Sequence, residues 1–457
     1  MNDERKLIKF NASTGFSVVL EFGNTEEKTA YEEKIKNGIY EVVITEIPFQ
    51  VNKVKIIEQL ANLINLKKIK LITKRGCTEF AVSYPDYSEI KKDHKKMMSY
   101  KEEWSKHEKI IDQQNYKDNL EKSLKSILQE LDGEIKVSVK EKNRFSGFNA
   151  YKMAIDLADV VILATPPGFR PEHFEYAINN DKHVFMEKPV ATDSSGVRKV
   201  LKAAKLADKK QLNVVVGLQR RYQKSYNTIL DLLQNGKIGK IISGQVYWND
   251  GGVWVNNRKP GQTELEYQMR NWYYFTWICG DHILEQHIHN IDVANWFIGE
   301  YPTHAQGMGG REVRNGKEHG QIFDHHFVEF HYPGGAVISS QCRHQKGTES
   351  RVDEVFQGSN GSVILGKGEI YNLNKELTYK YTKSWSEDAN PYQVEHDKLF
   401  LSIRNGEVIS DTENAAKTTL TAIMGRMATY TGKKITWDQI MNSKENLVPD
   451  NLSWNSD

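Results

Sequence analysis

Three residues have the types and spacing that proton transfer at a carbon–oxygen bond requires. Lys188 follows the apolar segment 183–186 and precedes Pro189, so its backbone is expected to be extended and its ammonium to lie at the carboxyl edge of a sheet. Glu285 and His289 are four residues apart, a spacing that places both side chains on one face of a helix. An ammonium can hydrogen-bond a reacting oxygen, and a carboxylate beside an imidazole can set its basicity. The pattern predicts acid–base chemistry.

Histidines and carboxylates are dense in the second half of the chain, which allows an alternative metal-binding interpretation. The set comprises His282, Glu285, His287, His289, Asp324, His325, His326 and His344. A histidine and a carboxylate at i,i+4 have a metal-ligand spacing, but His287 is expected to turn about 200° from Glu285 at about 100° per residue. We therefore expect cleft-lining and core histidines and no metal site. A metal-dependent lyase or hydrolase is the weaker alternative.

The elements that must position these residues alternate regularly from about residue 115. The predicted helices are 119–131, 150–157, 171–179, 194–210 with Ser194 as its N-cap, and one ending near residue 235; the predicted strands are 134–139, 159–164, 183–186 and 213–216. Short, uniformly apolar strands between amphipathic helices are typical of a parallel sheet covered on both faces. The sequence therefore predicts an α/β, Rossmann-like doubly wound domain over residues 113–238.

The pattern changes after Gly239 to longer strands in which apolar and polar residues alternate. The predicted strands are 241–248, 327–332, 337–342 and 362–365, and the predicted helices are 282–297 and 413–430. This pattern predicts an α+β domain over residues 239–457 with a large, mainly antiparallel open sheet. Residues 1–112 are patterned differently and form an atypical segment of unknown fold.

Composition limits the partners. The 457 residues include 62 Lys+Arg and 60 Asp+Glu, for a formal net charge of +2, whereas nucleic-acid-binding proteins usually have a clear basic excess. No segment approaches the roughly 18 consecutive apolar residues of a membrane span, and the first ten residues lack a signal-peptide core. We expect a cytoplasmic protein without nucleic-acid or membrane partners. The cysteines, Cys77, Cys279 and Cys342, lack metal-ligand spacing and are expected to be buried free thiols.

Three blocks of sequence resemble the signature segments of the glucose–fructose oxidoreductase/inositol dehydrogenase (Gfo/Idh/MocA) family. They are residues 164–167 (ATPP), 186–191 (MEKPVA) and 280–292 (GDHILEQHIHNID), and the resemblance covers about residues 115–440. It implies a dinucleotide-binding domain joined to a domain whose open sheet forms one wall of a substrate cleft. It also implies NAD or NADP as cofactor, a sugar- or cyclitol-like substrate, and a homo-oligomer that pairs through the open sheet.

The resemblance also implies roles for individual residues. Lys188 and His289 match the catalytic lysine and the acid/base histidine, and Glu285 stands where the family usually has Asp, so the identity of the substrate is in question. Substrate contacts are expected from these three residues and from Arg270, Trp272 and Tyr273, with core packing as the alternative for the aromatic rings. The implied cofactor contacts are Ala164, Thr165, Pro166, Pro167, His173, Glu187, Lys188, Pro189 and Gln219.

The phosphate-binding fingerprint G-x-G-x-x-G is absent from the sequence. The G-x-G pairs at 307–309 and 366–368 both lack the third glycine. The fingerprint glycines let backbone amides bind a pyrophosphate, and each such hydrogen bond to a charged group is worth roughly 1.5–3 kcal/mol. The alternative function is therefore a non-catalytic sugar-cleft or scaffold protein that has lost dinucleotide binding.

A different resemblance occupies the position where the fingerprint is expected. Residues 43–53, within a segment of about residues 40–70, resemble the DNA-cleaving subunit of bacterial type IIA topoisomerases. No Arg-Tyr catalytic pair accompanies the segment, so no DNA cleavage is inferred. The N-terminal segment joins the regularly patterned part of the chain near residues 111–119. An acidic residue that selects NAD over NADP is expected within this junction, at residues 112–114.

Overall fold

The computed structural model describes residues 147–383, 387–449 and 452, together with the backbone of three short N-terminal strands. These strands are β1 (Leu20–Glu21), β2 (Val42–Ile44) and β3 (Lys70–Leu71). The chain forms two compact units, Met1–Thr165 and Pro166–Asp457. The elements predicted between residues 119 and 139, residues 112–114 and Cys77 lie outside the described residues, and the domain boundaries at 112 and 238 stay predictions.

The first unit contains parallel and antiparallel strand pairs. Strand β2 is parallel to β4 (Val160–Leu163), and β1 is antiparallel to β3. All four residues of β4 are buried, as expected for a short run of β-branched and apolar side chains. Helix α5 (Ala150–Asp156) precedes β4. Both elements confirm the predicted helix 150–157 and strand 159–164.

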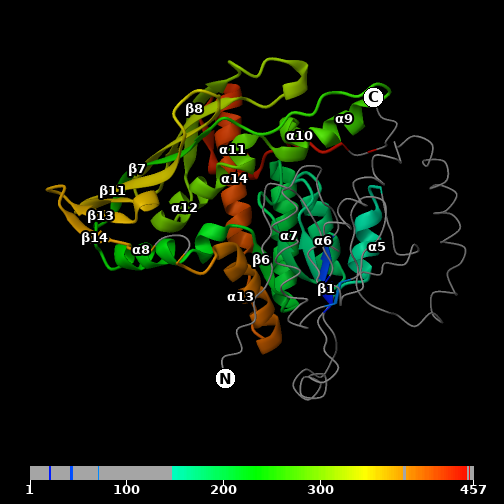
Figure 1. Ribbon diagram of the computed structural model, residues 1–457, viewed down its shortest axis with the longest axis horizontal. Helices are drawn as coiled ribbons and strands as arrows, with labels where there is room; N and C mark the ends of the chain where they lie inside the picture. The colour runs from blue at the N-terminus through cyan, green and yellow to red at the C-terminus, as the bar shows by residue number, and fades with distance from the viewer. Residues whose placement is uncertain are drawn as a thin grey trace, which may run out of the picture. The chain divides into compact units, whose positions relative to one another are not determined.

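The second unit begins with helices and strands that alternate along the chain. They are α6 (Arg170–Asn179), β5 (His183–Met186), α7 (Ser194–Lys209), β6 (Val214–Val216), the 3-10 helix η4 (Gln219–Tyr222) and α8 (Lys224–Gln234). Strands β5 and β6 are parallel and almost completely buried, and α6 and α7 pack side by side (Figure 1). This Rossmann-like arrangement confirms the predicted fold class.

One helix boundary in this region differs from the prediction. The N-cap of α7 is Asp193, whose carboxylate accepts a hydrogen bond from the Gly196 amide at 2.7 Å, and Ser194 is already helical. Asp193 has the extended backbone that an N-cap requires. Both residue types are good N-caps, so the sequence alone did not separate them.

A nine-stranded sheet follows, in the order β14-β13-β12-β11-β7-β10-β9-β8-β15. Its strands are β7 (Ile241–Asp250), β8 (His304–Gly310), β9 (His325–His331), β10 (Val337–His344), β11 (Arg351–Gly358), β12 (Gly361–Ile364), β13 (Glu369–Asn372), β14 (Leu377–Lys380) and β15 (Ile435–Thr436). Neighbouring strands are antiparallel except β7 and β10. Buried residues alternate with half-buried ones along β9 and β10, so one face is packed and the other is open. The predicted open, mainly antiparallel sheet is confirmed.

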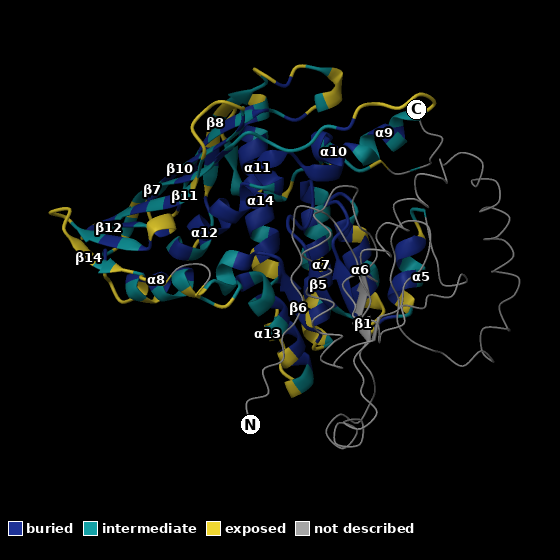
Figure 2. Cartoon of the chain, in the orientation of Figure 1, coloured by how far each residue is buried: buried dark blue, intermediate teal, exposed yellow. Residues whose placement is uncertain are grey.

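Two long helices cover the packed face of this sheet. Helix α12 (Ile288–Ile298) packs against β7 and β11, and α14 (Thr412–Thr431) packs against β8 and β9. Helix α14 also contacts α7 and β6, which explains why it is buried around most of its circumference (Figure 2). Within the second unit, α14 therefore joins the Rossmann-like elements to the large sheet. It confirms the helix predicted at 413–430.

The single helix predicted at 282–297 is wrong. The segment forms a short helix, α11 (His282–Glu285), and then α12, which begins at Ile288. The amides of Gln286 and His287 both donate to the carbonyl of His282, at 3.0 and 3.2 Å, so the hydrogen-bond ladder shifts by one residue at this point. The periodicity of the sequence continues through the break, so the break could not be seen in it.

The remaining helices are short or lie at the edges of the sheet. They are α9 (Glu264–Arg270), η5 (Trp272–Tyr274), α10 (Thr276–Cys279), η6 (Lys317–His319), η7 (Leu365–Lys367), α13 (Pro391–Asn405) and α15 (Trp437–Met441). Cys279 and Cys342 are buried and free, as predicted. Within the described part of the chain, no helix is both long and apolar enough to span a bilayer.

Candidate functional site

Lys188 lies two residues beyond the end of β5, and its side chain reaches α11. Only 3% of Lys188 is exposed to solvent. Its ammonium donates to the backbone carbonyl of Glu285 and lies 3.3 Å from Glu285 Oε1. A buried ammonium needs such partners, because an unpaired charge away from water is strongly unfavourable. The structure therefore brings together two of the three residues predicted to be catalytic.

His289 lies in the first turn of α12 and is also buried. Its ring stacks on Trp248 of β7 with ring centroids 5.9 Å apart. Burial, reinforced by the positive charges of Lys188 and Arg220, holds the pKa of His289 well below its ordinary value. The imidazole is therefore neutral near pH 7 and can accept a proton. Its Nδ1 has no hydrogen-bond partner among the described residues.

The predicted pairing of Glu285 with His289 is not seen. The two residues lie on different helices because the chain breaks between α11 and α12. The Glu285 carboxylate bonds to Lys188, and within the described ranges no hydrogen bond joins it to His289. Glu285 is thus placed to hold the ammonium rather than to orient the imidazole.

Two carboxyl groups near Lys188 are perturbed by burial. Burial raises the pKa of Glu187 to about 7, against the opposing charges of Lys188 and Arg170. Burial also raises the pKa of Glu285, against the charge of Lys188. A Cβ atom at Gly217, directly after β6, would come within 2.6 Å of the Glu187 carboxylate, so a larger residue there would displace this carboxylate. Perturbed carboxyls beside an ammonium are typical of catalytic sites.

The residues predicted to bind the cofactor occupy several places. Ala164 and Thr165 follow β4 at the end of the first unit, and Pro166 and Pro167 open the second; all four are buried. His173 of α6 stacks on Phe169 with ring centroids 6.1 Å apart.

Gln219 and Pro189 lie at the ends of neighbouring parallel strands. Gln219, in η4, donates to the Tyr392 hydroxyl at 3.2 Å, and its buried Oε1 has no partner in the part of the chain that the structure describes. The Pro189 carbonyl accepts a hydrogen bond from the Arg170 guanidinium. Arg170 is almost fully buried, and the sequence analysis missed it because nothing in its position after a turn distinguishes it from a surface arginine.

The aromatic residues predicted to bind substrate differ in their surroundings. Tyr273 stacks on His344 with centroids 5.6 Å apart, and burial, with a contribution from the Glu285 charge, raises its pKa well above the ordinary value. Trp272 packs edge-on against Trp254 and Tyr273, and its indole nitrogen is buried. Arg270 ends α9 and is half-buried. Tyr273 and Trp272 are therefore both buried among aromatic rings, whereas Arg270 is half-buried.

Two further residues near the site were not predicted. Arg220 of η4 donates to Glu354 of β11, which also accepts hydrogen bonds from Tyr226 at 2.8 Å and from Asn290 at 2.7 Å. Glu354 is completely buried, so the ion pair fixes Arg220 in place. Arg220 contributes to the low pKa of His289. Arg220 pairs with a residue 134 positions later, so the sequence around Arg220 does not indicate this role.

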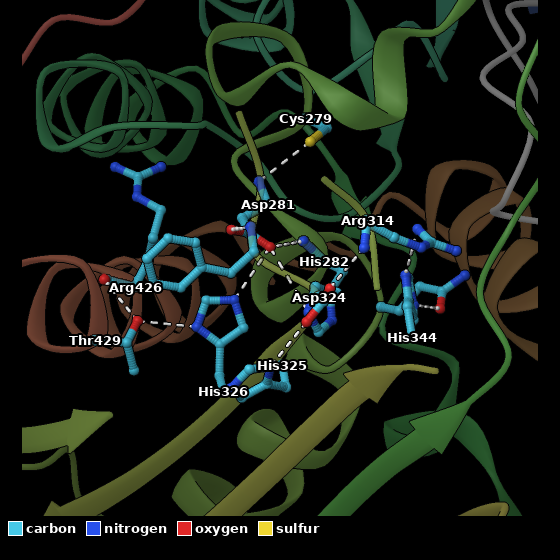
Figure 3. Close-up of polar contacts among 12 residues, drawn as sticks. Cys279, Asp281, His282, Arg314, Asp324, His325, His326, His344, Arg426 and Thr429 are labelled. Atoms are coloured by element: carbon cyan, nitrogen blue, oxygen red, sulfur yellow. Dashed lines mark hydrogen bonds and ion pairs between the residues drawn. The ribbon is translucent and has the colours of Figure 1, made fainter. Parts of the chain in front are cut away.

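Most of the histidines in the metal-binding alternative are dispersed. His287 bonds to Ser340 at 2.7 Å, His325 pairs with Asp324 at 2.7 Å, and His344 contacts Arg314 and Gln286. Among the described residues, His282 and His326 come together with Asp281, a residue that the sequence analysis did not single out (Figure 3). The ring of His282 also stacks on His344, with ring centroids 4.3 Å apart.

Known families and proteins resemble this chain in both sequence and fold. Residues 112–218 match a family described as "Oxidoreductase family, NAD-binding Rossmann fold", and residues 226–364 match the "GFO/IDH/MocA C-terminal domain". An inositol 2-dehydrogenase of Rhizobium meliloti is 24% identical over 274 residues, which cover 58% of this chain and 76% of the relative. A 2,7-anhydro-N-acetylneuraminate hydratase of Escherichia coli is 28% identical over 183 residues, 40% of this chain and 45% of the relative.

Solved structures share the fold. Myo-inositol 2-dehydrogenase from Lactobacillus plantarum has a TM-score of 0.51 at 21% identity and covers 68% of this chain and 88% of its own. Levoglucosan dehydrogenase, in complex with NADH and levoglucosan, has a TM-score of 0.54 at 15% identity, with coverage of 69% and 87%. The segment that resembles a topoisomerase precedes the matched residues and stays a prediction. From residue 112 onward, the matched segments show that the chain belongs to the Gfo/Idh/MocA oxidoreductase family.

Proposed function

We propose that this protein is an NAD(P)-dependent oxidoreductase that interconverts a hydroxyl and a carbonyl at one carbon of a sugar- or cyclitol-like substrate. The observation that carries the proposal is the buried ammonium of Lys188, held by Glu285 and close enough to His289 to lower the pKa of its imidazole. Family membership supports the reaction class, and the names of the relatives, inositol and levoglucosan dehydrogenases, support the substrate class.

In the proposed reaction, the protein handles the proton. The neutral His289 accepts the proton of the substrate hydroxyl, and the Lys188 ammonium donates a hydrogen bond to the same oxygen as it becomes a carbonyl. Glu285 keeps Lys188 in place. The nicotinamide ring, when bound, supplies the hydride acceptor. One alcohol and one oxidised cofactor give one carbonyl, one reduced cofactor and one proton.

The residues at the ends of β5 and β6 fit the nicotinamide side of such a cofactor. Gln219 Oε1 is a buried acceptor that has no hydrogen-bond partner among the described residues. The carboxamide N–H of a nicotinamide ring is a donor that would satisfy it. Glu187, Pro189 and Gln219 would hold this end of the cofactor, with Pro166 as a further predicted contact. Because the G-x-G-x-x-G motif is missing, the sequence offers no standard site for the pyrophosphate of the cofactor. Direct measurement of cofactor binding is therefore the first test.

Titration of the purified full-length protein with NADH, followed by nicotinamide fluorescence, tests cofactor binding. We expect saturation at micromolar concentrations. No binding at millimolar concentrations would overturn the proposal and favour the non-catalytic scaffold. Turnover is then tested with NAD⁺ and NADP⁺ against a panel of cyclitols and aldoses.

A pair of lysine variants tests the catalytic assignment. Lys188→Met is expected to lower kcat/KM by roughly 10²–10⁴-fold because the reacting oxygen loses its hydrogen-bond donor. Lys199→Met removes an exposed lysine of α7 that pairs with Glu172 and serves as the matched control. Equal activities of the two variants would show that Lys188 has no role in turnover.

A further inference from the structure

Asp281, His282 and His326 form a compact group beside the proposed catalytic residues. Asp281 is the N-cap of α11, His282 is its first residue, and His326 lies on β9. The three residues are buried, and one ligand atom from each lies within 4.8 Å of the others. Figure 3 shows their side chains directed toward one another. Two imidazoles and a carboxylate are a ligand set that suits a divalent transition metal.

His282 is the first indication that this group has an unfilled partner. Its side chain is completely buried, yet neither ring nitrogen has a hydrogen-bond partner among the described residues. Its ring also lies close to two other imidazoles, with ring centroids 4.9 Å from His326 and 4.3 Å from His344. Buried polar atoms in native proteins are nearly always satisfied, and an orphaned pair of ring nitrogens calls for an explanation.

His326 is the second indication, and it depends on which ring nitrogen carries the proton. The Thr429 hydroxyl donates to the Arg426 carbonyl at 2.9 Å, so it must accept from His326 Nδ1 at 2.9 Å. When Nδ1 alone carries a proton, Nε2 presents a lone pair to Asp281 Oδ1, 3.2 Å away. Two acceptors at this distance repel each other unless a second proton or a cation lies between them. Metal-binding histidines are typically oriented by such a bond at the other nitrogen.

Asp281 is held in the geometry that a ligand requires. Its Oδ2 accepts from the Phe323 amide at 3.0 Å and from the Tyr430 hydroxyl at 2.5 Å. Its Oδ1 accepts from the His282 backbone amide, as the N-cap of α11, and is the oxygen nearest both imidazoles. Oδ1 lies 3.2 Å from His326 Nε2 and 3.9 Å from His282 Nε2. Metal–ligand bonds of about 2.0–2.1 Å in a tetrahedron separate ligand atoms by about 3.3 Å. Small side-chain movements therefore suffice to close the site.

Neighbouring groups that could compete for the metal are already satisfied. Arg314 donates to His344 Nδ1 at 3.3 Å, so His344 Nε2 carries the proton and donates to Gln286 at 3.1 Å. The Cys279 thiol donates to the Tyr273 carbonyl at 2.8 Å and accepts from the Asp281 amide at 3.1 Å. The protein thus offers three ligands, and a water molecule completes a tetrahedral set.

We propose that Asp281, His282 and His326 bind one divalent transition-metal ion, with Zn²⁺ the best match to the nitrogen and oxygen ligands. The ion ties the start of α11 to β9, while Thr429 and Tyr430 of α14 support the ligands. Glu285 ends the same short helix and holds Lys188, so the metal acts as a structural centre that positions the proposed catalytic lysine. The metal itself does not contact the reacting carbon.

The metal site is tested on the full-length protein without reference to turnover. After removal of metals with a chelator, the protein is titrated with Co²⁺ and then with Zn²⁺, and metal content is measured by mass spectrometry. We expect one Co²⁺ per chain with the visible absorption of a tetrahedral centre, displaced by one equivalent of Zn²⁺. Failure of the metal-free protein to bind either ion at micromolar concentrations overturns the proposal, whether or not NADH binds.

Variants locate the site. His326→Gln is expected to abolish the tetrahedral Co²⁺ spectrum, whereas His325→Gln, at the adjacent and partly exposed position of β9, retains it. Thr429→Val, which removes only the hydroxyl that orients His326, is expected to weaken Zn²⁺ binding by about 10–100-fold. It serves as the milder variant should His326→Gln fail to fold. Loss of the spectrum in His325→Gln, or unchanged affinity in Thr429→Val, contradicts the assignment.

Discussion

At the scale of single residues, the site is dominated by charges removed from water. Glu187, Lys188 and Glu285 are each less than one-twentieth exposed to solvent, and the ammonium of Lys188 pairs with the carboxylate of Glu285. Burial raises the pKa of both carboxyls, whereas the ammonium opposes that rise. The balance leaves Glu187 titrating close to neutral pH, where a small change in its surroundings decides whether it is charged.

The titration of Glu187 makes stability depend on pH. Its pKa rises from an ordinary 4.5 to about 7 on folding, so the folded protein holds the proton more tightly than the unfolded chain. The free energy of unfolding is therefore expected to fall by up to about 3 kcal/mol as the pH rises from about 4.5 through about 7. Glu187→Gln removes this contribution, which is measured by urea unfolding across the range. Glu172→Gln, at an exposed position of α6, is the control. If the dependence of unfolding free energy on pH is the same in Glu187→Gln as in the unsubstituted protein, the assignment is contradicted.

The neutral state of His289 predicts how kcat/KM changes as the pH is lowered. Burial, Lys188 and Arg220 keep the pKa of His289 well below 6.5, so the imidazole stays a proton acceptor as the pH is lowered to about that value. We expect kcat/KM to show no loss from His289 protonation between pH 8 and 6.5. His289→Asn is expected to lower kcat by roughly 10²–10⁴-fold with NADH affinity unchanged. His331→Asn, on the open face of the sheet, is the control, and equal activity of the two variants refutes a catalytic His289.

At the scale of elements, close approaches of the backbone fix where the helices begin. The amide of Gly168, in the turn before α6, donates to the Ile278 carbonyl of α10 at 2.8 Å. A Cβ atom at Gly168 would lie 2.4 Å from the Trp277 carbonyl oxygen, closer than atoms can pack. Gly168 directly follows Pro166 and Pro167 in the sequence, but only the structure shows that a second helix lies against it.

Gly168→Ala is therefore expected to destabilise the protein by about 1–3 kcal/mol, because α6 and α10 must separate. The effect is measured as the change in the free energy of unfolding. Gly310→Ala is the matched control, since a Cβ atom there would approach no atom closer than 3.5 Å. Similar stabilities of the two variants would show that the contact between α6 and α10 is not tight in solution.

At the scale of the whole molecule, one face of the large sheet carries the half-buried residues that alternate with buried ones along β9 and β10. Cross-strand partners share a face, and one row across the open side runs through Met308, Phe327, Gln341 and Tyr247. Met308 is 72% exposed, although it is apolar. The other three residues of the row are half-buried, and large side chains that stay partly exposed on a sheet are typical of a contact with another chain.

Family resemblance predicts that two copies pair through this face, and the row supplies a test. We expect sedimentation equilibrium to give a multiple of the monomer mass, and Met308→Glu to shift the protein toward monomer because a buried, unpaired carboxylate is unfavourable. Leu373→Glu, equally exposed but in the turn between β13 and β14, is the control. A monomeric protein, or equal effects of both substitutions, would refute pairing through this face.

The sequence by itself determined the two fold classes and the order of most helices and strands up to residue 250, and it predicted Lys188 and Glu285 as site residues. These features depend on local periodicity and on short motifs, which the chain carries wherever it folds. The tertiary structure decided the break after Glu285, the partners of Arg220 and the meeting of Asp281 with His326. The two contacts join residues 134 and 45 positions apart, and only the packing of helices on a sheet brings them within bonding distance.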